Sequence, residues 1–175
     1  MIFAAIDPGS VHAAIAVFHG PTPVFVDDIR TVNGMLDATA LAHALQDMKV
    51  ERTVVENVHA MPKQGLSSTF KFGMGCGIIH GVAGALRLPL TLVSPNQWKA
   101  FHALKAEKEA SRALAIRKWP EMNRHLDRKK DADRAEALLI GDWYYVRCVM
   151  SRNNPFADPN LFEPGSPGYG KLVQS

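Results

Sequence analysis

Ile2-Phe3-Ala4-Ala5-Ile6-Asp7-Pro8-Gly9-Ser10 places five apolar residues in a row, followed by an acid and a turn. A short apolar run that ends at proline and glycine predicts a buried strand. A second run, Thr53-Val54-Val55, also ends on an acid, Glu56. Because neighbouring strands of a sheet lie only about 4.8 Å apart, acids at their ends can reach one point in space. Asp7 and Glu56 are therefore expected to lie close together.

Another acidic pair lies in the amphipathic stretch 132–140. Asp133 and Glu136 are three residues apart, so a helix would present both carboxylates on one face. Grouped carboxylates repel one another and lose hydration, which is tolerable mainly when they bind a cation. Asp7, Glu56, Asp133 and Glu136 are accordingly predicted to form one divalent-metal site. Asp131 is interpreted as a helix N-cap or first-turn acid, with a secondary role near the metal as the alternative.

The composition is that of a single globular domain, with 175 residues and a hydrophobic fraction of 47%. Every apolar run is shorter than the roughly 20 residues of a membrane span, and no basic signal-peptide lead is seen. A cytoplasmic protein without a membrane partner is therefore expected. Cys76 and Cys148 lack metal or disulfide spacing and are interpreted as reduced packing residues.

Basic residues are concentrated in one part of the chain. Residues 1–62 hold three Lys/Arg against seven Asp/Glu, whereas residues 99–130 hold ten against four. Such a segment is commonly a solvated helical surface. Beside a cluster of acids it favours the alternative, a surface that binds phosphate groups next to a metal site.

The order of predicted elements indicates an α/β fold, a mixed sheet flanked by helices. Strands are predicted at 1–6, 13–18, 24–29, 52–56 and 90–93, and helices at 38–48, 69–86, from 95, 107–118 and 131–149. Asp37 and Ser94 are the predicted N-caps of two of these helices. Five glycines in 69–86 are interpreted as allowing close helix packing. Residues 1–150 form the predicted domain, and 151–175, rich in Asn, Pro, Gly and Ser, a flexible tail.

These features together resemble the RuvC family of Holliday-junction resolvases, over residues 1 to about 149. The matching pieces are Ile6-Asp7-Pro8-Gly9-Ser10, Val55-Glu56, Phe72-Gly73, Gln97-Trp98-Lys99, Ala106-Glu107-Lys108 and the helix that carries Asp133 and Glu136. The chain has Glu136 where bacterial members usually have aspartate, and it diverges between Lys108 and Asp131. Both departures are similar to the phage-encoded branch, which implies the cytoplasm of a host cell.

The resemblance implies a ribonuclease H-like five-stranded sheet and an endonuclease that resolves Holliday junctions and other branched DNA. Two Mg²⁺ or Mn²⁺ ions per site would be held by Asp7, Glu56, Asp133 and Glu136, with Lys108 as a further catalytic residue. The paired nicks would leave 5′-phosphate and 3′-hydroxyl ends, and the enzyme would be a homodimer. The glycine-rich helix 69–86, with its apolar stripe, is the candidate interface. The implied DNA-binding residues are Lys63, Phe70, Lys71, Lys99, Lys105 and Arg112.

Several alternatives stay open. Lys105 competes with Lys108 for its position, and Phe72 or Phe70 could be a core residue instead of a DNA contact. A different nuclease on the same fold could act on RNA–DNA hybrids or debranch DNA generally. A DNA-binding module without catalytic activity is the other class of function that the sequence allows.

Overall fold

The computed structural model describes residues 1–9, 13–59, 65–105 and 107–151. The predicted tail therefore lies almost wholly outside the described residues, and so does Lys63. No helix in the described part of the chain is long and apolar enough to cross a membrane.

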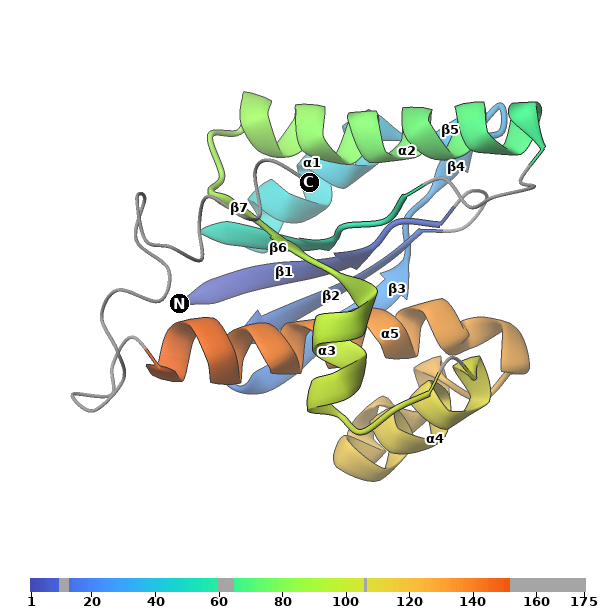
Figure 1. The fold of residues 1–175 in the computed structure, drawn as a ribbon. Coiled ribbons are helices and arrows are strands. Elements are labelled where there is room, and N and C mark those ends of the chain that lie inside the picture. Colours follow the sequence, from blue (N-terminus) through green and yellow to red (C-terminus); the bar gives the residue numbers. More distant parts are fainter. Residues whose placement is uncertain (10–12, 60–64, 106, 152–175) are drawn as a thin grey trace, which may run out of the picture.

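A mixed sheet of five strands forms the centre of the molecule, as the sequence predicted (Figure 1). Its strands, in spatial order, are β3 (Thr22–Asp28), β2 (Ala14–His19), β1 (Ile2–Asp7), β6 (Arg52–Glu56) and β7 (Leu90–Val93). The first three form an antiparallel meander, whereas β1, β6 and β7 are parallel. Strand β1 reads as an unbroken apolar run because both of its faces are covered.

Helices cover the two faces of the sheet (Figure 1). One face carries α1 (Ala38–Asp47) and α2 (Leu66–Ala85), and the other carries α5 (Ala132–Tyr144). The side chains of β1 alternate between the two layers. Phe3 belongs to the core cluster that includes α5, and Ile6 belongs to the cluster that includes α1 and α2.

Two further helices lie on the α5 side of the sheet, α3 (Pro95–Phe101) and α4 (Lys108–Lys118). Short 3₁₀ turns, Pro120–His125 and Lys129–Asp131, lead from α4 into α5, and a π-helical segment, Tyr145–Met150, continues it. The predicted continuous helix 131–149 is thus divided. Both predicted N-caps are confirmed: Asp37 accepts a hydrogen bond from the Ala40 backbone, and Ser94 forms a capping box with Gln97.

A small hairpin, β4 (Thr31–Val32) with β5 (Met35–Leu36), was not predicted. Asn33 and Gly34 form its turn with φ values of 53° and 74°. An Asn-Gly pair adopts such angles readily and is a common two-residue hairpin turn. The sequence therefore contains a hairpin turn motif at Asn33-Gly34. The strands on either side have only two residues each, which is too short for a strand pattern to be recognised.

Within the described part of the chain, only one of the five α2 glycines has a close neighbour, so the close packing predicted for them does not occur against the protein's own sheet at the other four. A Cβ at Gly75 would lie 3.6 Å from Leu36 Cδ1, whereas one at Gly73, Gly77, Gly81 or Gly84 would meet no described atom within 4 Å. The close approach occurs elsewhere, at Gly141 of α5. A Cβ there would lie 2.2 Å from the Phe18 ring, so only glycine lets α5 approach β2 this closely.

Candidate metal centre

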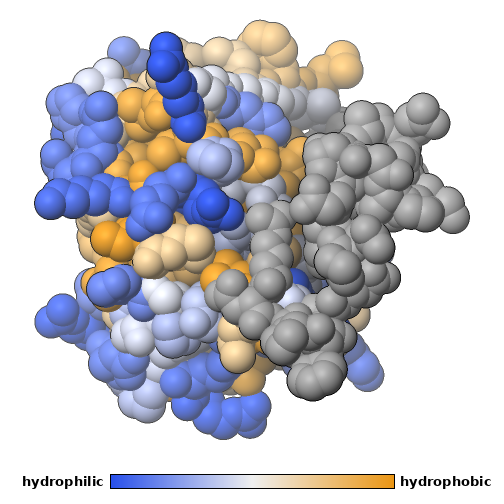
Figure 2. All heavy atoms as spheres, turned by 90° about the vertical axis from the view of Figure 1, so that its left-hand side faces the viewer, coloured by the Kyte–Doolittle hydropathy of each residue, from blue (hydrophilic) through white to orange (hydrophobic). Residues whose placement is uncertain are grey.

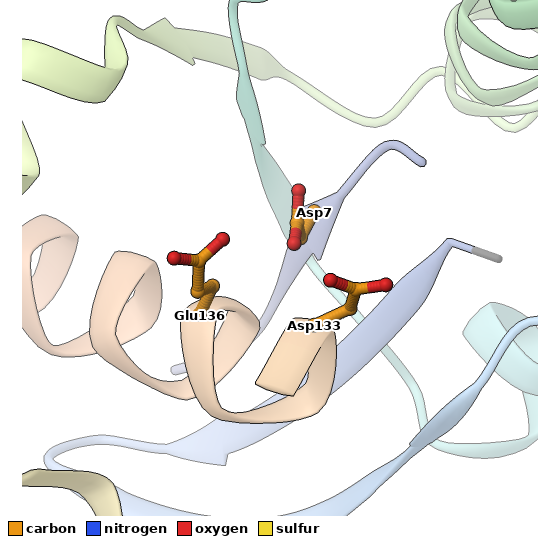
Figure 3. A group of neighbouring side chains, drawn as sticks. All are labelled: Asp7, Asp133 and Glu136. Atoms are coloured by element: carbon orange, nitrogen blue, oxygen red, sulfur yellow. The ribbon is translucent and has the colours of Figure 1, made fainter. Parts of the chain in front are cut away.

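Three acidic side chains meet at the end of the sheet where β1 and β6 finish. Asp7 is the last residue of β1, and α5 crosses the same end with Asp133 and Glu136 in its first two turns. Figure 3 shows the three carboxylates pointing toward one another, two from the helix and one from the strand.

Figure 2 views the opposite end of the molecule, where apolar side chains are exposed among charged ones.

The geometry of this group suits a hard divalent cation. One carboxylate oxygen from each of Asp7, Asp133 and Glu136 lies within 4.8 Å of the other two. Asp7 and Glu136 are buried and Asp133 is half-buried. Magnesium and manganese ions prefer oxygen ligands, and Mg²⁺ in particular is commonly held by a few carboxylates while keeping several waters. The donor set therefore fits the metal that the sequence predicted.

Burial makes the negative charge of this group costly. It raises the pKa of Asp7 well above its usual range, and the neighbouring carboxylates of Glu56, Glu136 and Asp133 raise it further, while Lys108 opposes them. Burial is also the largest cause that raises the pKa of Glu56, against the hydrogen bond from Trp98. A bound cation would offset this repulsion, because it favours the ionised form of each carboxylate.

Glu56 lies beside the group and is held differently. Strands β1 and β6 are in register with Ile6 opposite Val55, so Asp7 and Glu56 follow as neighbours. The Glu56 carboxylate is buried, and its Oε1 accepts a hydrogen bond of 2.7 Å from Trp98 Nε1. The structure thus groups three of the four predicted acids and places the fourth next to them.

Two lysines from the α3–α4 region contact these acids. Lys108 Nζ lies 2.5 Å from Asp133 Oδ1, and Lys99 Nζ lies 3.3 Å from Glu136 Oε1. Lys105 is exposed, and within the described residues no ion pair joins it to the acids. Of the two competing lysines, Lys108 is therefore the one that contacts the site.

The other residues predicted to bind DNA lie in different settings. Phe70 and Lys71 are exposed near the start of α2, and Lys71 lines the same pocket as Gly9, which follows the end of β1. Phe72 is half-buried. Arg112 is mostly buried, and its guanidinium bonds Glu109 and the Leu126 carbonyl, each at 2.7 Å. Phe70 and Lys71 are thus available to a ligand, whereas Arg112 is engaged within the protein.

Asp131 does not belong to the three-residue group. It occupies the N-cap position of α5, as one of the two interpretations predicted, and it is buried, but its side chain makes no capping hydrogen bond to this helix. The Arg128 guanidinium binds its Oδ1 at 2.8 Å, and the Arg128 backbone N–H donates to its Oδ2 at 2.9 Å. These bonds hold the turn that leads into α5.

Besides Trp98, which donates to Glu56, sequence analysis missed a second residue that contacts the acids, Ser111. It is fully buried on α4, and its Oγ donates to Glu136 Oε1 at 3.1 Å. Lys108 and Ser111 are three residues apart, as are Asp133 and Glu136, so one face of α4 meets one face of α5. That matched spacing was the only signal in the sequence that could have indicated Ser111.

No protein-family model matches the chain, and no characterised protein sequence matches it. Solved structures do match. RuvC from Thermus thermophilus has a TM-score of 0.58 and 19% identity, over 82% of this chain and 95% of that one. The fowlpox virus resolvase, in complex with Holliday junction DNA, has a TM-score of 0.57 and 20% identity, over 85% and 99%.

The yeast mitochondrial Holliday junction resolvase has the same arrangement, with a TM-score of 0.52 and 13% identity, over 82% of this chain and 78% of that one. At these identities the likeness establishes the fold. The chain has the ribonuclease H-like fold of RuvC and of these resolvases, which confirms the prediction from its sequence.

Proposed function

We propose that this protein is a metal-dependent endonuclease that resolves four-way junctions and other branched DNA. The observation that carries the proposal is the convergence of Asp7, Asp133 and Glu136 at the end of the sheet. The fold supports it, because similar structures include RuvC and the fowlpox resolvase, each in complex with a Holliday junction. The enzyme would act in the cytoplasm, that of the host if the chain is phage-encoded.

In this proposal the acids hold two Mg²⁺ or Mn²⁺ ions, with Asp7 between Glu56 on one side and the α5 pair on the other. Such ions supply an activated water and stabilise the leaving oxygen when bound. Lys108, whose side chain is 61% exposed, can reach from Asp133 to a phosphate oxygen. The nicks would carry 5′-phosphate and 3′-hydroxyl ends.

The surface that would bind DNA combines cations with an aromatic side chain. Lys99 lies beside Glu136, and Lys71 and Phe70 lie near the start of α2. Phe70 is 69% exposed, so its ring is accessible to a ligand. An exposed aromatic ring of this kind can stack on an unpaired base at the branch point. Lys63 would extend this surface but lies outside the described residues.

A comparison of substrates tests this proposal. In Mg²⁺ we expect paired nicks at symmetric positions of a synthetic four-way junction, with little cutting of the matched linear duplex. The nicks should be sealed by DNA ligase, as the proposed end chemistry requires. A fork and an RNA–DNA hybrid of the same sequence are assayed in parallel. Hybrid cleavage without junction cleavage would support the ribonuclease H alternative, and no Mg²⁺-stimulated nicking at all would support a non-catalytic binding module.

A homodimer is the second part of the proposal. A four-way junction offers two symmetric cleavage points, which suit two active sites related by a two-fold axis. The face of α2 that carries Gly73, Gly77, Gly81 and Gly84 is exposed, and a Cβ at these positions would meet no described atom. Glycines at this helical spacing let a second helix approach closely.

The substitution Gly77→Gln is expected to convert the dimer to a monomer without loss of folding. A side chain at this position has free space within the chain but would separate two helices packed along the glycine face. Light scattering coupled to gel filtration measures the mass of each variant. Ser68→Gln, also exposed and on the opposite side of α2, is the control and should stay dimeric. A dimeric Gly77→Gln variant would exclude this face as the interface.

A further inference from the structure

Trp98 is the one tryptophan whose indole N–H meets the acidic site. Its side chain is fully buried, and its Nε1 donates to Glu56 Oε1 at 2.7 Å. A buried indole N–H needs an acceptor, but a backbone carbonyl would serve as well as a carboxylate. Because Trp98 belongs to the core cluster on the α5 side, its hydrogen bond to Glu56 links that core directly to an acid of the proposed metal site.

The chain brings Trp98 to this point by a short and well-defined path. Glu56 is opposite Val93 in the parallel pair β6–β7, so the chain leaves β7 beside Glu56. The capping box of Ser94 and Gln97 then starts α3 at once. Trp98 lies in the first turn of α3, which returns its ring over the end of β6. Because the cap sets where the helix begins, it also sets the height of the indole above the strand.

The ring itself has little freedom to move. It meets the His102 ring edge to face with centroids 6.4 Å apart, and Lys99 Nζ lies 5.0 Å from its centroid. Because the indole N–H is fixed, its hydrogen bond occupies Oε1 of Glu56 and limits the rotation of the Glu56 carboxylate. The other oxygen is then the one available to a ligand, in a residue adjacent to Asp7.

We propose that Trp98 is a positioning residue, whose indole N–H holds Glu56 as a ligand of the divalent cation that Glu56 would share with Asp7. Hydrogen bonds from outside the ligand shell typically orient metal-binding carboxylates, and their loss weakens metal affinity by about 10- to 100-fold. The inference rests on the metal site of the proposed function, but it does not depend on which DNA is cut.

Nuclear magnetic resonance of the ¹⁵N-labelled protein tests the coupling without DNA and with Trp98 itself unchanged. The chain has three tryptophans, and Trp98 is assigned by comparison with Trp119→Phe and Trp143→Phe variants. We expect the Trp98 indole resonance to shift on titration with Mg²⁺ and to saturate with the binding measured by calorimetry. The other two indole resonances should stay in place. A Trp98 resonance that does not move while Mg²⁺ binds would overturn the proposal, and so would a protein that binds neither Mg²⁺ nor Mn²⁺.

The second test removes the donor and keeps the shape of the ring. Benzothienylalanine has sulfur in place of the indole N–H, and its incorporation at position 98 should weaken Mg²⁺ binding by about 10- to 100-fold. The same replacement at Trp143, buried in the same core cluster, is the matched control and should leave Mg²⁺ affinity unchanged. Equal affinities of the two variants would refute the positioning role. Junction cleavage that fails while Mg²⁺ binding still depends on Trp98 would refute only the proposed function.

Discussion

Asp7→Asn is expected to reduce the cutting of a four-way junction in Mg²⁺ by about 1,000-fold or more, while junction binding persists. Asparagine keeps the size of the side chain at the end of β1 but removes the charge from the residue at the centre of the acidic group. A correctly held metal contributes several kcal/mol to the transition state, and about 4 kcal/mol corresponds to three orders of magnitude in rate. Single-turnover cleavage and a gel-shift assay measure the two quantities separately.

The same variant should be more stable than the natural protein at neutral pH in EDTA. Burial and three neighbouring acids raise the pKa of folded Asp7 well above its ordinary value of 3.8, so the folded state binds the proton more tightly than the unfolded state. The contribution of Asp7 to stability therefore falls as the pH rises from about 4 through the raised pKa. Asparagine carries no such penalty. Melting temperatures measured from pH 4 to pH 7 should show an advantage of the variant that grows with pH and shrinks in Mg²⁺.

Asp47→Asn is the control for both measurements. Asp47 is exposed at the end of α1, on the face of the sheet away from α5, so its neutralisation should change neither cutting nor the pH dependence of stability. An Asp7→Asn variant that cuts at nearly the natural rate would rule out the carboxylate group as the reaction centre. One that melts below the natural protein at neutral pH would contradict the electrostatic account of the site.

Lys108→Met is expected to lower the cutting rate by about 100- to 1,000-fold at saturating Mg²⁺, with a much smaller effect on junction affinity. Lys108 Nζ lies 2.5 Å from Asp133 Oδ1, so it is next to the position where ions held by the acids would bind the phosphate. A cation at this place stabilises the negative charge that develops on the phosphate oxygens, and loss of one such donor typically costs this much in rate. Methionine keeps an unbranched apolar side chain and removes only the charge. Single-turnover rates across a Mg²⁺ titration separate this effect from weaker metal binding.

Lys105→Met is the matched control for Lys108→Met. It removes the same charge from an exposed position three residues earlier in the chain, so general attraction to DNA falls equally in both variants. The Lys105 variant should cut at close to the natural rate at saturating DNA. Equal losses in the two variants would show that Lys108 acts only as a phosphate contact.

Local sequence patterns predicted most of the fold. The strands at 52–56 and 90–93 agree with β6 and β7 at both ends, because each has β-branched or apolar residues at its centre and is followed by a turn-forming residue, Asn57 or Ser94. The caps at Asp37 and Ser94 were equally readable, since a capping side chain and the backbone N–H that donates to it are only three residues apart. The β4–β5 hairpin was missed because two residues on each side of a turn leave no periodicity to detect.

The glycines of α2 show where such patterns stop being informative. Their spacing identified an unusual helix face, but the sequence could not say whether that face is turned to the sheet or away from it. Four of the five have open space beside them in the described structure. The glycine that does allow close packing is Gly141. Its role could not be predicted from the sequence, because its partner Phe18 lies more than a hundred residues away in the chain.

The sequence by itself determined which acids end strands and which share a helix face, because strand ends and an i, i+3 spacing are local properties of the chain. Only the tertiary structure decided how these acids are held. It placed Asp7 close to Asp133 and Glu136 of α5. It also paired Glu56 with the indole N–H of Trp98 and Glu136 with the hydroxyl of Ser111, whereas Asp131 binds Arg128 outside the group. The contact that a side chain makes depends on how α3 and α4 pack against α5 and the sheet. Periodicity along the chain does not encode that packing, because it arises between segments far apart in sequence.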